Sequence, residues 1–151
     1  MITIEEFKKK HSNKIRLIGL DLGSKRIGVS ICDENQSIAT PFKTINKTNI
    51  KDLIIQLKGI IEENNIKGII VGNPINMDGS QGKSSQSAFD LAKNLSKLID
   101  IPISLWDERL SSEASFKYGK ELGQNTTNIV SKLDKNAAAF ILQGAIDFLC
   151  N

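Results

Sequence analysis

The sequence predicts a single α/β domain built on a mixed sheet of five strands. The first half contains three apolar segments with short connections, residues 15–22, 27–32 and 38–45, which predict an antiparallel meander. The second half alternates helical stripes with the predicted strands 66–71 and 101–106. Because helices that connect successive strands make those strands parallel, the meander should adjoin βαβ units in one sheet.

The helices are predicted from apolar residues that recur every three or four positions. One stripe runs from Ile50 to Ile61 and a second from Ala88 to Ile99, and a shorter helical segment is expected over 112–122. The last helix carries a buried stripe of Ala137, Ala138, Ile141, Leu142, Ala145, Ile146 and Leu149. The first two helices supply the crossovers that the parallel half of the sheet requires.

Length and composition indicate one domain with a substantial core. The chain has 151 residues, of which 40% are hydrophobic. We assign residues 15–151 to this domain and residues 1–14 to a polar N-terminal stretch. The net charge of +3 permits nucleic-acid binding without arguing for it. Cys32 and Cys150 form no CxxC pair, which favours a reducing compartment over a disulfide framework or a zinc ribbon.

The N-terminal stretch lacks the apolar segment of a signal peptide, and no later segment reaches the roughly 18 apolar residues that a spanning helix needs. We therefore expect a soluble, cytoplasmic protein without a membrane partner. His11, the single histidine, lies in this stretch, which excludes histidine triads and histidine-rich metal sites. Any chemistry must then rest on carboxylates, hydroxyls, lysines or arginines.

Asp21 is the first candidate functional residue, because it stands near the end of the first apolar strand. A carboxylate there is costly to bury unless it is paired, protonated or bound to a cation. One interpretation is a catalytic or metal-binding carboxylate. The other is a turn aspartate that bonds its own backbone before Gly23.

Further acids should reach the same edge of the sheet, because open α/β sheets collect functional groups at the carboxyl ends of parallel strands. Asp107 and Glu108 end the fifth strand, and adjacent residues point to opposite sides, so both need not enter one site. We expect Glu108 to do so. The alternative for this pair is a salt bridge with Arg109 or a helix N-cap. Asn73 and Asp78 follow the fourth strand nearby.

Asp134 is a third carboxylate, predicted to open the last helix on the face of Ala138. The alternative is helix capping, because Ser131 and Asp134 have a spacing similar to a capping box. Together with Asp21 and Glu108 it would form a cluster suited to Mg²⁺ or Mn²⁺, since hard cations take oxygen ligands. Paired ions of this kind activate water and stabilise the leaving oxygen in phosphodiester cleavage.

The glycine-rich loop 72–85 ends in GKS but is not a P-loop, because Met77 stands where the pattern needs glycine. It can still hold a phosphate through backbone N–H groups beside Lys83, or it is a plain connection. Lys25 and Arg26 can neutralise a nucleic-acid backbone, although solvated turn residues would look the same. Trp106 is assigned to the core rather than to base stacking.

Four segments resemble, in this order and spacing, the YqgF/RuvX family: GLDLGSKRIGVS, VGNPINMDGSQG, WDERLSS and DKNAAAFILQGAID. The resemblance covers nearly the whole chain from Ile15 onward, with serine in DERLSS where threonine is common. It implies an RNase H-like fold, a five-stranded mixed sheet flanked by helices on both faces.

Family members are described as nucleases that process the 5′ end of precursor 16S ribosomal RNA, and earlier as Holliday junction resolvases. By motif match, Asp21 corresponds to the first-strand acid, Glu108 or Asp107 to the acid of the fifth strand, and Asp134 to that of the last helix. The resemblance thus implies an endonuclease that uses Mg²⁺ or Mn²⁺. The expected substrate-binding residues are Lys25, Arg26, Asn73, Lys83 and Arg109.

Several alternatives stay open. Precursor ribosomal RNA is the favoured partner, but a four-way DNA junction would use the same chemistry and favour a homodimer over a monomer. A protein of another class, a non-catalytic nucleic-acid-binding assembly factor, would keep the fold without cleavage. The DLG turn also resembles the phosphate-binding strand of actin-like and Hsp70-like ATPases, which need two such domains.

Overall fold

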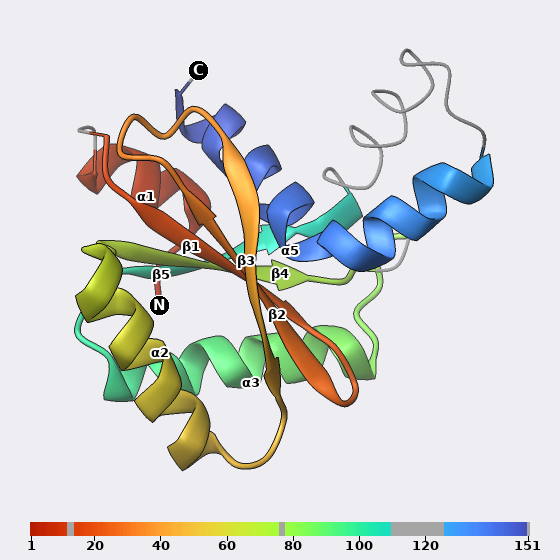
Figure 1. Ribbon diagram of the computed structural model, residues 1–151, viewed down its shortest axis with the longest axis horizontal. Helices are drawn as coiled ribbons and strands as arrows, with labels where there is room; N and C mark the ends of the chain where they lie inside the picture. Colours follow the sequence, from red (N-terminus) through yellow and green to blue (C-terminus); the bar gives the residue numbers. More distant parts are fainter. Residues whose placement is uncertain (12–13, 76–77, 110–125, 151) are drawn as a thin grey trace.

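The computed structural model describes residues 1–11, 14–75, 78–109 and 126–150, with side chains described outside 126–136. The elements in chain order are α1 (Ile4–Lys10), β1 (Leu17–Leu22), β2 (Arg26–Cys32), β3 (Ala39–Asn46), α2 (Ile50–Asn64), β4 (Gly68–Asn73), α3 (Lys83–Leu98), β5 (Ile103–Asp107) and α5 (Thr126–Cys150). Five strands form one sheet in the order β3-β2-β1-β4-β5 (Figure 1). The predicted segment 112–122 lies outside the described residues.

The strand pairing confirms the predicted mixed sheet. β2 pairs antiparallel with both β1 and β3, whereas β4 pairs parallel with both β1 and β5. Each strand begins and ends within two residues of its predicted bounds. The carboxyl ends of β1, β4 and β5 therefore lie at the same edge of the sheet.

Helices cover both faces of the sheet, as Figure 1 shows: α2 and α3 lie on one face, α1 and α5 on the other. Successive residues of a strand point to opposite faces. Ile18 and Leu20 of β1 accordingly belong to the core cluster under α2 and α3. Leu17 belongs to the cluster under α1 and α5, and Trp106 is buried there as predicted.

The polar N-terminal stretch contributes α1 to this second cluster. Thr3 caps the helix, because its hydroxyl accepts a hydrogen bond from the Glu6 backbone N–H (3.1 Å). Phe7 is 1% exposed, and Ile2 forms a parallel bridge with Ser104 of β5. Helix α1 thus packs beside the last strand.

Helix α5 approaches the sheet closely over Gly19. A Cβ on Gly19 would lie 2.6 Å from the Ser30 hydroxyl oxygen and 2.8 Å from the Leu142 Cβ. The Ser30 hydroxyl donates to the Ala138 carbonyl oxygen (2.6 Å), which ties the helix to β2. Glycine is needed here because any side chain would push the helix away from the sheet.

The prediction that Asp134 opens the last helix is wrong. Helix α5 begins at Thr126, so Asp134 lies within the helix and the capping-box interpretation no longer applies. The apolar stripe continues upstream of Asp134 through Ile129, Val130 and Leu133, so the prediction placed the helix start too late. Within the described part of the chain, no helix combines the length and apolarity needed to cross a membrane.

Candidate active site

Asp21 lies at the end of β1, on the face of the sheet that α5 covers, because it alternates with Leu17 and Gly19. Its partial burial raises the pKa of this carboxyl. The turn that follows is closed by the backbone, with the Gly23 N–H donating to the Arg26 carbonyl (2.9 Å). The turn therefore does not require the Asp21 side chain.

Glu108 follows β5 and reaches across β4 over Gly72. Its Cδ and Cγ atoms lie 3.1 and 3.2 Å from the position that a Cβ on Gly72 would occupy. Burial raises the pKa of Glu108 to about 7, and the negative charges of Asp21 and Asp107 contribute to the same shift. Two carboxylates, from β1 and from the residue after β5, thus share one partly buried environment above a glycine.

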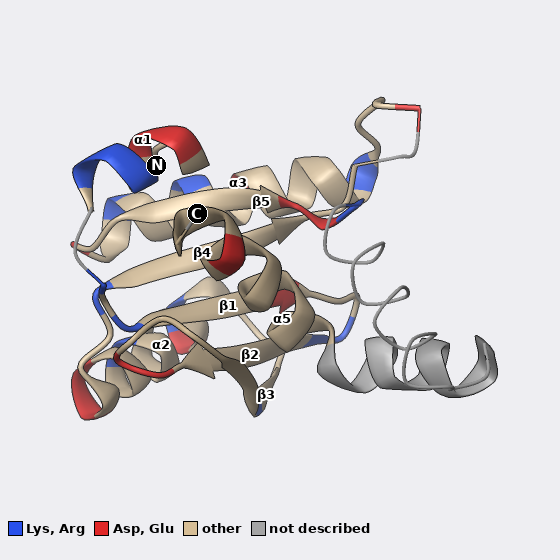
Figure 2. Cartoon of the chain, turned by 90° about the horizontal axis from the view of Figure 1, so that it is seen from above, with Lys and Arg blue, Asp and Glu red and all other residues tan. Residues whose placement is uncertain are grey.

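Asp107 has a different role from its neighbour. The Arg109 guanidinium pairs with it (Nη2 to Oδ2, 2.7 Å), and the Arg109 backbone N–H donates to its Oδ1 (3.0 Å). The side-chain hydrogen bond from Arg109 is the main cause that lowers the pKa of Asp107. In Figure 2 the end of β5 is accordingly an acidic stretch followed by a basic one. The salt-bridge alternative describes Asp107, and Glu108 is the acid whose pKa burial and the charge of Asp21 raise.

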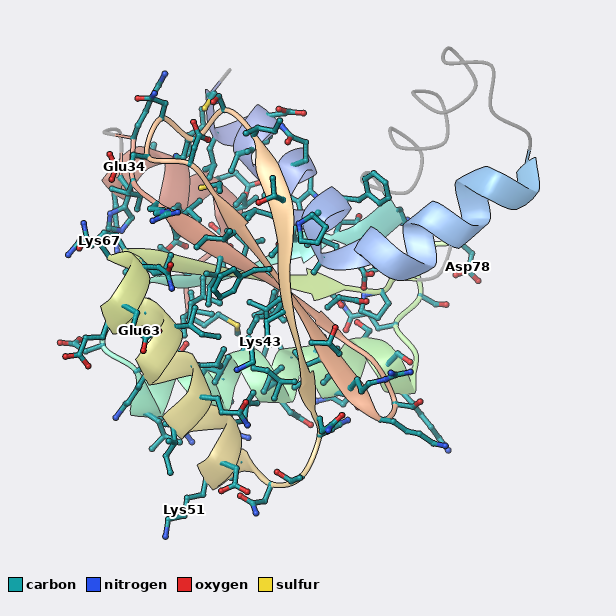
Figure 3. All side chains as sticks on the ribbon, in the orientation of Figure 1. Glu34, Lys43, Lys51, Glu63, Lys67 and Asp78 are labelled. Atoms are coloured by element: carbon teal, nitrogen blue, oxygen red, sulfur yellow. The ribbon has the colours of Figure 1, made fainter. Side chains whose placement is uncertain are left out.

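The polar residues of the loop after β4 contact one another and the first turn of α3. The Asn73 side-chain oxygen accepts from the Ser85 hydroxyl (2.7 Å), which joins the end of β4 to the first turn of α3. Lys83 is exposed at the start of α3. Asp78 is exposed (Figure 3), and the hydrogen bond from the Ser80 hydroxyl is the main cause that lowers its pKa.

A cavity of about 690 Å³ opens beside Asp21, between β2, β3 and α5. Arg26 lines it, whereas Lys25 is exposed in the turn before β2. Gly28 lies opposite Asp21 in the β1–β2 register, and a Cβ there would lie 3.7 Å from the Asp21 Cβ. Gly28 therefore leaves space beside Asp21, whereas the place that a Cβ on Gly72 would take is filled by Ile141 and Glu108.

Sequence reasoning missed these two glycines, although both stand inside the segments that carried the family resemblance. A glycine that alternates with buried apolar residues in a strand indicates a close approach of backbone or ligand. That signal was available at Gly28, between Ile27 and Val29, and at Gly72, which follows Val71.

The donor set of the two acids suits a hard divalent cation. The described residues contain no group of three or more histidine, cysteine or acidic side chains placed to hold a metal. Asp21 and Glu108 supply two carboxylates, and the side chain of Asp134 lies outside the described residues. Mg²⁺ commonly binds through one or two carboxylates and completes its shell with water and substrate phosphates. A cation between these two acids would also offset their mutual repulsion.

The family model described as "RuvX: Holliday junction resolvase" matches residues 15–148. The chain belongs to the RuvX family. One relative of this RuvX chain, from Pelagibacter ubique, is 68% identical over 151 residues and covers all of both chains. Another, from Paramagnetospirillum magneticum, is 42% identical over 132 residues, 87% of this chain and 85% of the relative. Both relatives carry the name "Putative pre-16S rRNA nuclease".

Solved structures similar to the RuvX chain include Thermus thermophilus RuvC in complex with a Holliday junction substrate, at a TM-score of 0.55 and 9% identity. The match covers 91% of this chain and 96% of that one. A second Thermus thermophilus RuvC structure matches at a TM-score of 0.52 and 8% identity, covering 86% and 92%. This likeness concerns the fold, and it confirms the predicted RNase H-like architecture.

Proposed function

We propose that this protein is a metal-dependent endonuclease that hydrolyses phosphodiester bonds of precursor 16S ribosomal RNA. The observation that carries the proposal is that Glu108, whose side chain lies over Gly72 of β4, is close enough to Asp21 at the end of β1 for the charge of Asp21 to add to burial in raising its pKa. The names of the RuvX relatives favour precursor ribosomal RNA as the substrate.

Asp21 and Glu108 would hold Mg²⁺ or Mn²⁺, with Asp134 as a third ligand. The bound cation would activate water and stabilise the leaving oxygen of the phosphodiester. Glu108, whose pKa is raised to about 7, must be deprotonated to act as a ligand, so cation binding is coupled to proton release. Gly72 keeps the Glu108 side chain close to β4, and therefore close to Asp21.

The basic residues near the two acids would position the substrate. Arg26 lines the cavity beside Asp21, and Lys25 precedes it in the same turn, where both can contact phosphates. Lys83 at the start of α3 and the polar Asn73 at the end of β4 would contact the substrate from the other side. Arg109 is engaged by Asp107 and would act through the loop that this pair fixes.

A four-way DNA junction is the second candidate substrate, because the matching family model is described as a Holliday junction resolvase. Symmetric cutting of a junction needs two active sites, so this activity would require a homodimer. A monomer suffices to cut an RNA leader.

The test is cleavage of matched labelled substrates, a precursor 16S 5′ leader and a synthetic four-way DNA junction, with and without Mg²⁺ or Mn²⁺. We expect metal-dependent cutting of the RNA, lost in Asp21→Asn and retained in Asp90→Asn. Asp90 is a matched control because it is exposed on α3, over the other face of the sheet. Cutting of the junction alone would show that DNA junctions, and not the RNA leader, are the substrate. Binding of both nucleic acids without cutting would contradict a nuclease function.

A further inference from the structure

We propose that the cavity beside Asp21 is a subsite for single-stranded nucleic acid, in which one unstacked base lies against the ring of Phe42. This subsite rests on the proposed nuclease function and says where the chain next to the reacting phosphate is held. Asp21 lines the cavity together with Gly28, Phe42 and Thr44, and Ala138 of α5 lies on its other side. The cavity is thus continuous with the candidate catalytic carboxylate.

Phe42 is displayed by a bulge in the edge strand. Val29 pairs with Lys43 and the next residue, Ser30, pairs with Pro41, so Phe42 is left out of the β2–β3 register. Bulges re-aim side chains and are common beside active sites. The Phe42 side chain is 44% exposed, although burial would stabilise a ring of this size. An aromatic ring kept at the surface beside a cavity is the element on which single-stranded nucleic acids stack their bases.

The surroundings of Phe42 are basic. Residues 24–32 and 36–47 contain Lys25, Arg26, Lys43 and Lys47, all exposed, and no acidic residue. Figure 3 marks Lys43 on β3, whereas Glu34 stands in the turn at the far end of the β2–β3 pair. A positive edge attracts a phosphate backbone without reading its sequence. The charge of this edge therefore matches nucleic acid, and the exposed ring adds a base contact.

The geometry favours a single strand over a duplex. Base faces are covered by stacking in a duplex, so Phe42 can contact only a base that has left the stack. Gly28 lies between Asp21 and Thr44 in the registers of β1, β2 and β3. Asp21, Gly28 and Thr44 thus follow one another across the sheet and line the same cavity as Phe42.

The first test measures binding of fluorescein-labelled single-stranded leader RNA by anisotropy, with the full chain in the Asp21→Asn background. We expect Phe42→Ala to raise the Kd about tenfold, the range of one base–aromatic stack, and Phe42→Trp to keep the affinity. Phe89→Ala is the matched control, because Phe89 is 41% exposed on α3 and lines no part of this cavity. Unchanged binding by Phe42→Ala, or an equal loss for Phe89→Ala, would overturn the subsite.

A second series replaces one nucleotide at a time by an abasic site. If one base stacks on Phe42, a single abasic position weakens binding as much as Phe42→Ala does, and the two losses do not add. Stacking is contradicted if the losses from Phe42→Ala and from the abasic site add at every position. It is also contradicted if Phe42→Ala weakens the binding of duplex RNA equally.

Cleavage separates this subsite from the proposed function. With Asp21 intact, Phe42→Ala should raise the KM for the leader and leave kcat at saturation unchanged. If Phe42→Ala cuts the leader with the rate and KM of the wild type, the subsite is contradicted and the nuclease function is supported. If the wild type cuts nothing but Phe42→Ala and one abasic position still weaken binding, the subsite is supported and the nuclease function is contradicted.

Discussion

The two faces of the sheet differ although the same strands build them. Under α2 and α3, β1 presents Ile18 and Leu20, which pack in a wholly aliphatic cluster. Under α1 and α5, the same strand presents Leu17, Gly19 and Asp21, and the neighbouring strands add polar groups. The alternation of one strand therefore separates a wholly aliphatic face from a face that combines a second core cluster with the carboxylates.

Glycines mark the second face in particular. Gly19 and Gly72 let residues of α5 approach the sheet, and Gly28 leaves space beside Asp21. Gly59 of α2, over the other face, has no atom within 4 Å of the position its Cβ would take. Close neighbours therefore exclude a side chain at Gly19 and Gly72, whereas a side chain at Gly59 would meet no other atom.

The largest effect on stability is expected from Leu57→Ala. Leu57 of α2 is completely buried against the sheet, so the substitution should lower the free energy of unfolding by about 2–5 kcal/mol through lost burial and a cavity. Urea unfolding measures the loss. Cleavage per folded molecule should stay at the wild-type level. A lower cleavage rate of the fully folded variant would show that the face under α2 and α3 affects the carboxylate site.

The next effect is a pH dependence of stability that comes from Glu108. Its pKa is about 7 in the folded protein and near 4.5 when unfolded, so between these values the folded state keeps a proton that the unfolded state has lost. Without divalent cation, the free energy of unfolding should therefore fall by up to about 3 kcal/mol as the pH rises from 4.5 to 7. Asp21, whose pKa is also raised, acts in the same direction.

Thermal unfolding of wild type and Glu108→Gln across this pH range measures the effect. The variant should lose most of the slope and exceed the wild type in stability above pH 7. Added Mg²⁺ should stabilise the wild type more than the variant, because the cation binds the ionised carboxylate. An identical slope in both proteins would show that Glu108 is not the titrating group.

A smaller effect contrasts two glycines. Gly19→Ala should cost about 1–3 kcal/mol, because its Cβ would overlap Ser30 and the α5 residue Leu142. Gly59→Ala, in the open middle of α2, should instead stabilise by about 0.5–1 kcal/mol. The denaturation midpoints of both variants measure these changes in stability. Equal changes would contradict the steric difference between Gly19 and Gly59.

Most of the fold was predictable from sequence because it rests on local patterns. The apolar runs of β1 and β4 and the stripe of α2 each indicated their element, and short connections indicated the meander. Asp21 could be singled out because an acid at the end of a buried strand needs an explanation. The alternation of side chains along β5 indicated that Asp107 and Glu108 need not enter one site, but it did not decide between them.

The rest depends on contacts between distant residues. The bulge at Phe42 depends on how β3 pairs with β2, and the Glu108 side chain over Gly72 depends on the β4–β5 pairing. The start of α5 at Thr126 was missed because Asp134 was assigned to the first turn, although Ile129, Val130 and Leu133 continue the apolar stripe upstream. Spacing alone carried no signal for the bulge at Phe42.

The most direct measurement compares two adjacent acids, Glu108→Gln and Asp107→Asn, in Mg²⁺-dependent cleavage of the precursor 16S leader. Glu108 meets Asp21, whereas Asp107 is held by Arg109, so the two variants separate the carboxylate site from a surface ion pair. Glu108→Gln should lose at least about a hundredfold in rate, since even supporting residues of metal sites cost 10–100-fold. Asp107→Asn should stay within a few-fold of wild type. The reverse order, or equal losses, would contradict a metal centre built on Asp21 and Glu108.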